Sequence, residues 1–179
     1  MQHSDDGELL DLVNFEDEVI GTVHRGEVDE KEFDLPGNVR AVDCFIVNSK
    51  NELFIPRRSM HKKMFPGGLD FSCAEHVQSG ESYDEAMVRG FKEELGMDIK
   101  RDNLLKIAKV NLRDFGVAPY FDTIYVYKSD VTPQYPIDEF TSHEWLAIQE
   151  LKDRLSSGEV AKRSMQHFLP FLEGYLNNK

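Results

Sequence analysis

The chain has little that would support a disulfide framework, a membrane span or a nucleic-acid surface. It has only two cysteines, Cys44 and Cys73, and they form no CxxC pair, which favours a reduced, cytoplasmic protein. No apolar run approaches the length of a transmembrane helix, and the acidic, polar N-terminus is unlike a signal peptide. Excess positive charge is also absent. Because the net charge is -12, we expect no nucleic acid polymer and no membrane among its partners.

What the sequence does contain is enough apolar material for a folded core. The 179 residues are 40% hydrophobic and 11% aromatic, and no repeat, linker or low-complexity run divides them. We therefore expect a single domain over residues 1–179. An acidic protein that acts on a phosphate compound must rely on divalent cations and local arginines. Whether the chain forms a homodimer is left open.

Hydrophobic periodicity predicts a mixed α+β order, with helices flanking a sheet. Strands or extended segments are predicted at 9–14, 18–24, 38–48, 52–58, 71–77, 104–112, 120–127 and 139–146. Helices are predicted at 28–33, 82–95, 148–155 and 160–175.

The most informative segment runs from Glu81 to Met97, where a glycine-bounded loop leads into an acidic helix. Ser82 is suited to the N-cap, with Glu85 three residues on, as in a capping box. Gly96 stands where a helix favours its terminating glycine. These signals predict both ends of one helix.

This helix carries carboxylates that suit a divalent cation. Arg89 and Glu93 are four residues apart and share a face, and Glu94 lies next to that face. With Glu81 in the entering loop, they form a cluster of hard oxygen ligands. Magnesium and manganese favour such ligands together with substrate phosphates.

The segment resembles the Nudix box, whose family pattern is Gly-x5-Glu-x7-Arg-Glu-U-x-Glu-Glu-x-Gly-U, where U is a bulky apolar residue. Glu81 takes the place of the first glutamate, and seven residues separate it from Arg89. The remaining matches are Phe91, Glu93, Glu94, Gly96 and Met97. The resemblance implies a Nudix-type α/β/α sandwich with a mixed sheet. It also implies a box over residues 75–97, an N-terminal hairpin at about 9–24 and C-terminal helices at about 148–176.

The resemblance further implies a hydrolase that acts on the phosphoanhydride bond of a diphosphate linked to another moiety. Mg²⁺ or Mn²⁺ would be held by Glu93 and Glu94, with Glu81 assisting, and Arg89 would orient the glutamates. The partner would be a small-molecule diphosphate. The identity of this diphosphate depends on the loops at 113–120 and 132–137, whose sequences do not indicate a substrate.

Two positions depart from the pattern. The opening glycine is Glu75, and the glutamate after the arginine is Gly90, a position that normally supplies a metal-binding carboxylate. Three interpretations follow: a hydrolase with a reduced metal set, a hydrolase with a replacement carboxylate, or a domain that binds a nucleotide-like ligand without turnover. Glu75 and Glu139 are the candidate compensating acids. On the pattern alone, Gly90→Glu should restore the lost carboxylate and remove a helix-interior glycine.

Outside the box, residues 53–59, 65–70 and 75–77 resemble the branch that includes isopentenyl-diphosphate isomerase and its hydrolase relatives. That branch places phosphate-contacting basic residues at Arg57 or Arg58, which alternate along a strand so that only one can face a cleft. Isomerase activity is a third alternative. It is disfavoured because Ala74 stands at the catalytic cysteine's place and Cys73 is shifted by one residue, although His76 matches the isomerase's metal-binding histidine.

Overall fold

The computed structural model describes residues 7–28 and 34–178. Its strands are β1 (Leu9–Val13), β2 (Val19–His24), β3 (Val39–Val47), β4 (Glu52–Arg58), β5 (Cys73–His76), β6 (Leu104–Asn111), β7 (Tyr120–Lys128) and β8 (Phe140–Ala147). Its α-helices are α1 (Tyr83–Leu95), α2 (Ile148–Ser156) and α3 (Met165–Asn177). Within the described ranges, no helix is long and apolar enough to cross a membrane.

The central sheet is mixed. Its strand order is β6-β7-β3-β4-β8, and β5 pairs separately with β3. β3 runs parallel to β7, whereas the other pairings are antiparallel. One edge of β3 is shared by two strands, because β4 is in register with it only where Val47 faces Leu53, and β5 pairs with it from Ala41 to Cys44. This divided edge places the short strand β5 beside the helix that follows it in the sequence.

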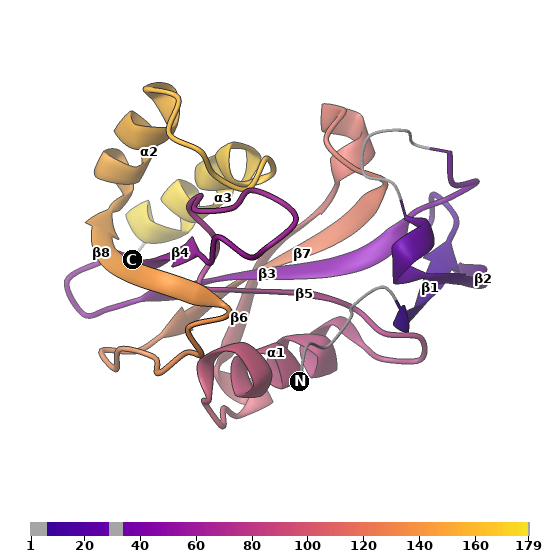
Figure 1. The fold of residues 1–179 in the computed structure, drawn as a ribbon, viewed down its shortest axis with the longest axis horizontal. Coiled ribbons are helices and arrows are strands. Elements are labelled where there is room, and N and C mark those ends of the chain that lie inside the picture. Colours follow the sequence, from indigo (N-terminus) through magenta and orange to yellow (C-terminus); the bar gives the residue numbers. More distant parts are fainter. Residues whose placement is uncertain (1–6, 29–33, 179) are drawn as a thin grey trace.

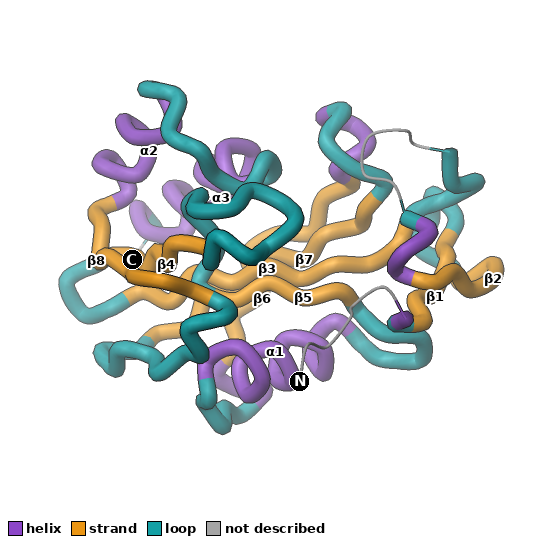
Figure 2. The backbone as a smooth tube through the Cα atoms, in the orientation of Figure 1, coloured by secondary structure: helices purple, strands orange, loops and turns teal. Residues whose placement is uncertain are grey.

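Helices cover both faces of the sheet, with α1 on one side and α2 and α3 on the other (Figure 1, and as a tube in Figure 2). A buried apolar cluster fills each gap. The cluster under α1 includes Met87 and Phe91, and the cluster under α3 includes Phe168 and Leu172. The α/β/α sandwich that the resemblance implied is therefore confirmed.

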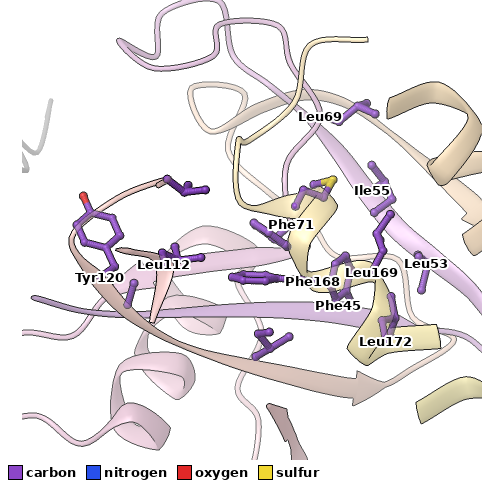
Figure 3. Packing of buried hydrophobic residues seen from close by; sticks show 14 of the residues in the cluster. Phe45, Leu53, Ile55, Leu69, Phe71, Leu112, Tyr120, Phe168, Leu169 and Leu172 are labelled. Atoms are coloured by element: carbon purple, nitrogen blue, oxygen red, sulfur yellow. The ribbon is translucent and has the colours of Figure 1, made fainter. Parts of the chain in front are cut away.

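Aromatic rings lie among the aliphatic side chains of the larger cluster (Figure 3). The rings of Phe45 and Phe71 meet edge to face with centroids 5.2 Å apart, and Phe168 of α3 lies 5.5 Å from Phe71. These side chains tie α3 to the strand β3 and to the loop before β5. They therefore hold the C-terminal segment against the part of the sheet that carries the candidate site.

Helix α1 begins and ends where the sequence predicts. Ser82 is the N-cap, its hydroxyl accepts from the Glu85 N–H, and the Glu85 carboxylate accepts from the Ser82 N–H, which completes a capping box. Gly96 adopts φ 62° in the left-handed region, and its N–H donates to the Phe91 carbonyl. Both ends of the helix that bears the box glutamates are therefore set by local sequence.

The N-terminal hairpin of β1 and β2 holds the loop that enters α1. Asp11 accepts hydrogen bonds from the Ser79 hydroxyl at 2.7 Å and from the Gly80 N–H at 3.2 Å. At the hairpin tip, Asp17 binds Arg40 at 2.6 Å and the Tyr83 hydroxyl at 3.0 Å. The hairpin thus contacts both the loop and the first turn of α1, and it forms the pair that the sequence predicts at about 9–24.

The predicted helix at 28–33 falls largely on residues 29–33, which lie outside the described part of the chain. The predicted helix at 160–175 begins only at Met165, so the prediction was wrong for residues 160–164. The reason is backbone pairing with Leu69, whose N–H donates to Val160 O at 2.8 Å and whose carbonyl accepts from Lys162 N at 3.0 Å. This pairing holds residues 160–162 in an extended conformation and brings Lys162 beside the loop before β5.

Candidate functional site

The guanidinium of Arg89 is the centre of a carboxylate cluster. It donates to both oxygens of Glu81 at 2.9 and 3.1 Å, to Glu93 at 3.2 Å and to the His76 carbonyl at 2.8 Å. It also pairs with Glu75 at 3.2 Å. Burial disfavours the charged guanidinium, but the bond to Glu81 and the charge of Glu75 outweigh it and raise the pKa of Arg89. Arg89 therefore fixes acids from α1, from the entering loop and from β5 in one place, the arrangement expected of a residue that orients the glutamates.

Glu94 lies where several charges meet. Its Oε2 accepts from the Ala74 N–H at 3.2 Å, so it reaches from α1 to the backbone of β5. Burial, and then the negative charge of Glu75, raise the pKa of Glu94 well above its usual value, while the positive charge of Lys162 opposes the shift. The charge of Glu139 acts in the same direction as that of Glu75. A nearby cation would therefore stabilise the charged form of Glu94.

Glu75 belongs to the same cluster. Side chains alternate along β5, so Cys73 and Glu75 face α1 whereas Ala74 and His76 face the opposite side of the sheet. Burial raises the pKa of Glu75 to about 7 against the opposing charge of Arg89, and the charge of Glu93 adds to the rise. The sequence left open whether the loop could bring Glu75 within reach of the box helix. The structure brings it there.

The space above Gly90 is occupied. A Cβ at this position would lie 2.5 Å from Cγ of Glu75 and 2.9 Å from Sγ of Cys73. Real Cβ atoms essentially never make such close approaches. These distances argue against the expectation that Gly90→Glu alone restores a carboxylate, because Glu75 already fills the room that the new side chain would need.

The two arginines predicted to bind phosphate are engaged by protein groups. Arg57 pairs with Glu159 at 2.6 Å and donates to the Gly67 carbonyl at 2.9 Å. Arg58 donates to the Met64 carbonyl at 2.9 Å and forms a close ion pair with Asp70. Within the described residues, the bonds found for both arginines go to these other groups and not to the box glutamates, so their part in phosphate binding stays a prediction.

Sequence reasoning missed Lys162. Its Nζ lies 3.3 Å from Oδ1 of Asp70, and its positive charge acts on Glu94. Burial works against the charged form, but the charges of Asp70 and Asp43 raise the pKa of Lys162. No local signal marks this residue in the sequence, because its position depends on the pairing of residues 160–162 with Leu69, far away along the chain.

Glu139, the second candidate compensating acid, lies in the loop before β8. Its carboxylate pairs with Lys62 at 2.6 Å, and its carbonyl accepts from the Ser59 N–H at 2.9 Å. Its charge reaches Glu94, but Lys62 already compensates it. Glu139 is therefore at the edge of the cluster, whereas Glu75 is inside it.

The residues that match the isomerase are arranged for other tasks. His76 accepts a hydrogen bond at Nδ1 from Arg25 at 3.2 Å, and burial, followed by the charge of Arg25, lowers its pKa well below the usual value. The imidazole is therefore neutral. Cys73 is fully buried, and burial, together with the charge of Glu94, raises the pKa of its thiol. A buried thiol with a raised pKa is a poor acid–base or nucleophilic group.

The cluster fits a magnesium or manganese ion by ligand type. Across the described residues, no three His, Cys, Asp or Glu side chains are placed to hold a metal by themselves. In proteins, Mg²⁺ usually keeps several waters and is bound by one or two carboxylates together with substrate phosphates. The bond from Arg89 reaches Oε2 of Glu93, and the bond from the Ala74 N–H reaches Oε2 of Glu94.

Comparison with known proteins identifies the family. The NUDIX domain profile matches residues 37–168. An uncharacterized Nudix hydrolase from Nostoc sp. is 36% identical over 160 residues, which cover 89% of this chain and 92% of that protein. A Nudix hydrolase from Deinococcus radiodurans is 37% identical over 159 residues, with coverage of 87% and 88%. An isopentenyl-diphosphate Delta-isomerase from Photorhabdus laumondii is 29% identical over 123 residues, covering 67% of this chain and 70% of that enzyme.

Solved structures agree with these sequence matches. A Deinococcus radiodurans protein superposes with a TM-score of 0.81 at 36% identity, covering 91% of this chain and 98% of its own. A MutT protein from Methanosarcina mazei superposes with a TM-score of 0.59 at 17% identity, covering 79% of this chain and 95% of its own, and so shares the fold. With a profile match over most of its length and relatives above 30% identity along nearly the whole chain, this protein belongs to the Nudix family.

Proposed function

We propose that this protein hydrolyses a phosphoanhydride bond in a small-molecule diphosphate linked to another moiety, with the help of Mg²⁺ or Mn²⁺. The observation that carries the proposal is the convergence of acids from separate elements on one place. Glu93 and Glu94 come from α1, Glu81 comes from the loop before it, and Arg89 holds them together. Both family membership and the oxygen-only ligand set support this assignment.

Each residue has a distinct part in the proposed reaction. Glu93 and Glu94 would hold the metal ion, which neutralises phosphate charge and lowers the pKa of water when bound. The Ala74 N–H fixes one oxygen of Glu94 and thereby orients the other. Glu81 assists through Arg89, because both of its oxygens accept from that guanidinium. One of the clustered glutamates would take the proton from the attacking water.

Lys162 would supply a cation to the substrate diphosphate. It comes from the C-terminal segment, opposite α1, and its charge acts on Glu94. A flexible ammonium group is well suited to phosphate. Asp70 restrains it at 3.3 Å, and Arg58 restrains Asp70 in turn. Arg57 and Arg58 would then support the phosphate site from behind.

The test combines metal binding with turnover. Calorimetric titration of the metal-free protein with Mn²⁺ should show a site that Glu94→Gln weakens strongly, whereas Glu16→Gln in the exposed hairpin turn should leave it unchanged. A panel of nucleoside diphosphate derivatives and prenyl diphosphates, assayed with and without metal, should then yield phosphate products from at least one compound. Equal Mn²⁺ affinity in wild type and Glu94→Gln would remove the metal assignment.

Other outcomes would favour the alternative functions. Metal and nucleotide binding without phosphate release across the panel would favour a binding domain. Conversion of a prenyl diphosphate without phosphate release would favour isomerase chemistry, which the alanine at position 74 argues against. We place the reaction in a reduced, cytoplasmic setting, in keeping with two buried cysteines that are both free.

A further inference from the structure

The two departures from the box pattern touch each other in the structure. Position 75, where the pattern has glycine, carries a glutamate on β5, and position 90, where the pattern has glutamate, is a glycine on α1. A Cβ at Gly90 would lie 2.5 Å from Cγ of Glu75 and 3.5 Å from its Cδ. The side chain of Glu75 therefore crosses directly over Gly90 in the gap between β5 and α1.

The two residue types have changed places across this gap. With glycine at 75, the strand would leave the gap open to a glutamate from the helix. With glycine at 90, the helix leaves the same gap open to a glutamate from the strand. Helix-interior glycine is unfavourable by roughly 1 kcal/mol against alanine, so its presence needs a reason. The close approach of Glu75 supplies that reason.

We propose that Glu75 supplies from β5 the metal-binding carboxylate that the family pattern takes from position 90 of the helix. This inference rests on the proposed function. The carboxylate end of Glu75 lies beside the helix face that presents Glu93 and Glu94: Glu75 and Glu93 both bind Nη1 of Arg89 at 3.2 Å, and the charge of Glu75 acts on Glu94. In this chain the box thus keeps its full number of acids.

A simpler role for Glu75 is that of an ion-pair partner for Arg89. The two roles make different demands. If Glu75 only pairs with Arg89, the residue at position 90 should not matter. If Glu75 replaces the metal ligand of position 90, moving the carboxylate back to the helix should restore metal binding. In addition, Arg89 already has Glu81 as a bidentate partner at 2.9 and 3.1 Å, so it does not depend on Glu75 for neutralisation.

The experiment is a double-mutant cycle of wild type, Glu75→Gly, Gly90→Glu and the double variant. Mn²⁺ affinity is measured by calorimetry and thermal stability is measured in EDTA. Glu75→Gly should keep the fold and lose Mn²⁺ affinity by at least about tenfold, since even outer-shell partners of a metal usually matter by that much. Gly90→Glu alone should lower the melting temperature because its side chain collides with Glu75. The double variant should regain most of the Mn²⁺ affinity and melt higher than Gly90→Glu.

Gly174→Glu in α3 is the matched control, because it places the same new side chain inside a helix with nothing within 4 Å of the added Cβ. It should not lower the melting temperature and should not change Mn²⁺ affinity. A further variant, Glu75→Gln, keeps the length of the side chain and should lose Mn²⁺ affinity like Glu75→Gly.

Two results would overturn the inference. One is wild-type Mn²⁺ affinity in Glu75→Gly. The other is a double variant that binds Mn²⁺ no better than Glu75→Gly while its circular dichroism and melting show an intact fold. Failure of the proposed function is distinguishable from both, because it would show as a wild-type protein that binds no Mn²⁺, or as a Glu94→Gln variant that binds it normally.

Discussion

Replacing Arg89 by methionine should destabilise the metal-free protein markedly at alkaline pH. The change keeps much of the side-chain volume but removes the charge that holds three carboxylates. Arg89 is 17% exposed, and its partners Glu75 and Glu81 are 15% and 21% exposed, so water screens these pairs only in part. Glu93 is 59% exposed, and its pair contributes little.

Breaking a buried ion pair by removal of one partner costs about 3–5 kcal/mol. Because the present pairs are partly exposed, the low end applies, and the expected loss for Arg89→Met is about 3 kcal/mol near pH 8. The stability of Arg89→Lys should fall between those of wild type and Arg89→Met, because an ammonium group keeps the charge but cannot span the same carboxylates.

The loss in Arg89→Met should shrink in acid. The pKa of Glu75 is about 7 even with Arg89 in place, against a reference of 4.5, and it rises further when the arginine is removed. A carboxyl whose pKa is raised by folding binds its proton more tightly in the folded protein, so stability falls as pH rises from about 4.5 to the folded pKa. The variant should therefore lose less stability at about pH 5.5 than at about pH 8.

Urea unfolding in EDTA at these two pH values measures the effect. Arg154→Met serves as the control, since Arg154 bridges the exposed acids Glu144 and Glu150 and should contribute less than about 1 kcal/mol. A loss in Arg89→Met below about 1 kcal/mol at the higher pH, or an equal loss at both, would refute the reasoning.

Three further changes have clear expectations. Cys73→Ser should leave turnover within a few-fold of wild type, because the thiol is buried with a raised pKa; loss of turnover with an intact circular dichroism spectrum would contradict this. Lys162→Met should raise KM for the diphosphate substrate about tenfold, the loss of one charged hydrogen bond, and steady-state kinetics that show an unchanged KM would exclude phosphate contact. Asp17→Asn should cost about 2 kcal/mol in urea unfolding, because the side chain binds Arg40 and Tyr83, while asparagine tolerates the positive φ. Burial raises the pKa of Asp17, but its bonds to Lys109 and Arg40 outweigh burial and lower the pKa below 3.8. Wild type should therefore lose the stability that Asp17 contributes only as pH falls below about 4, and Asp17→Asn should not show that acid loss.

Local signals predicted the box helix well, and long-range pairing explains what the sequence could not supply. The limits of α1 follow from Ser82, Glu85 and Gly96, which act within the helix itself. The family resemblance located Glu93 and Glu94 at its end. The contact of Glu75 with the helix could not be predicted, because it depends on the pairing of β5 with β3. Likewise, Lys162 reaches the site only through its backbone bond to Leu69. The same pairing explains why the helix predicted at residues 160–175 begins five residues late, at Met165.

The contact between Glu75 and Gly90 also limits how one arrangement of the box can change into the other. A chain with glutamate at both positions must fit a Cβ 2.5 Å from the Cγ of Glu75, so that intermediate is strained. A chain with glycine at both positions is free of strain but has one acid fewer. Each single step is therefore unfavourable for a different reason, and only the pair of changes is neutral. Taken one position at a time, the sequence departs from the box pattern at both 75 and 90. In the fold, these departures amount to one carboxylate that enters the gap between β5 and α1 from the strand instead of the helix.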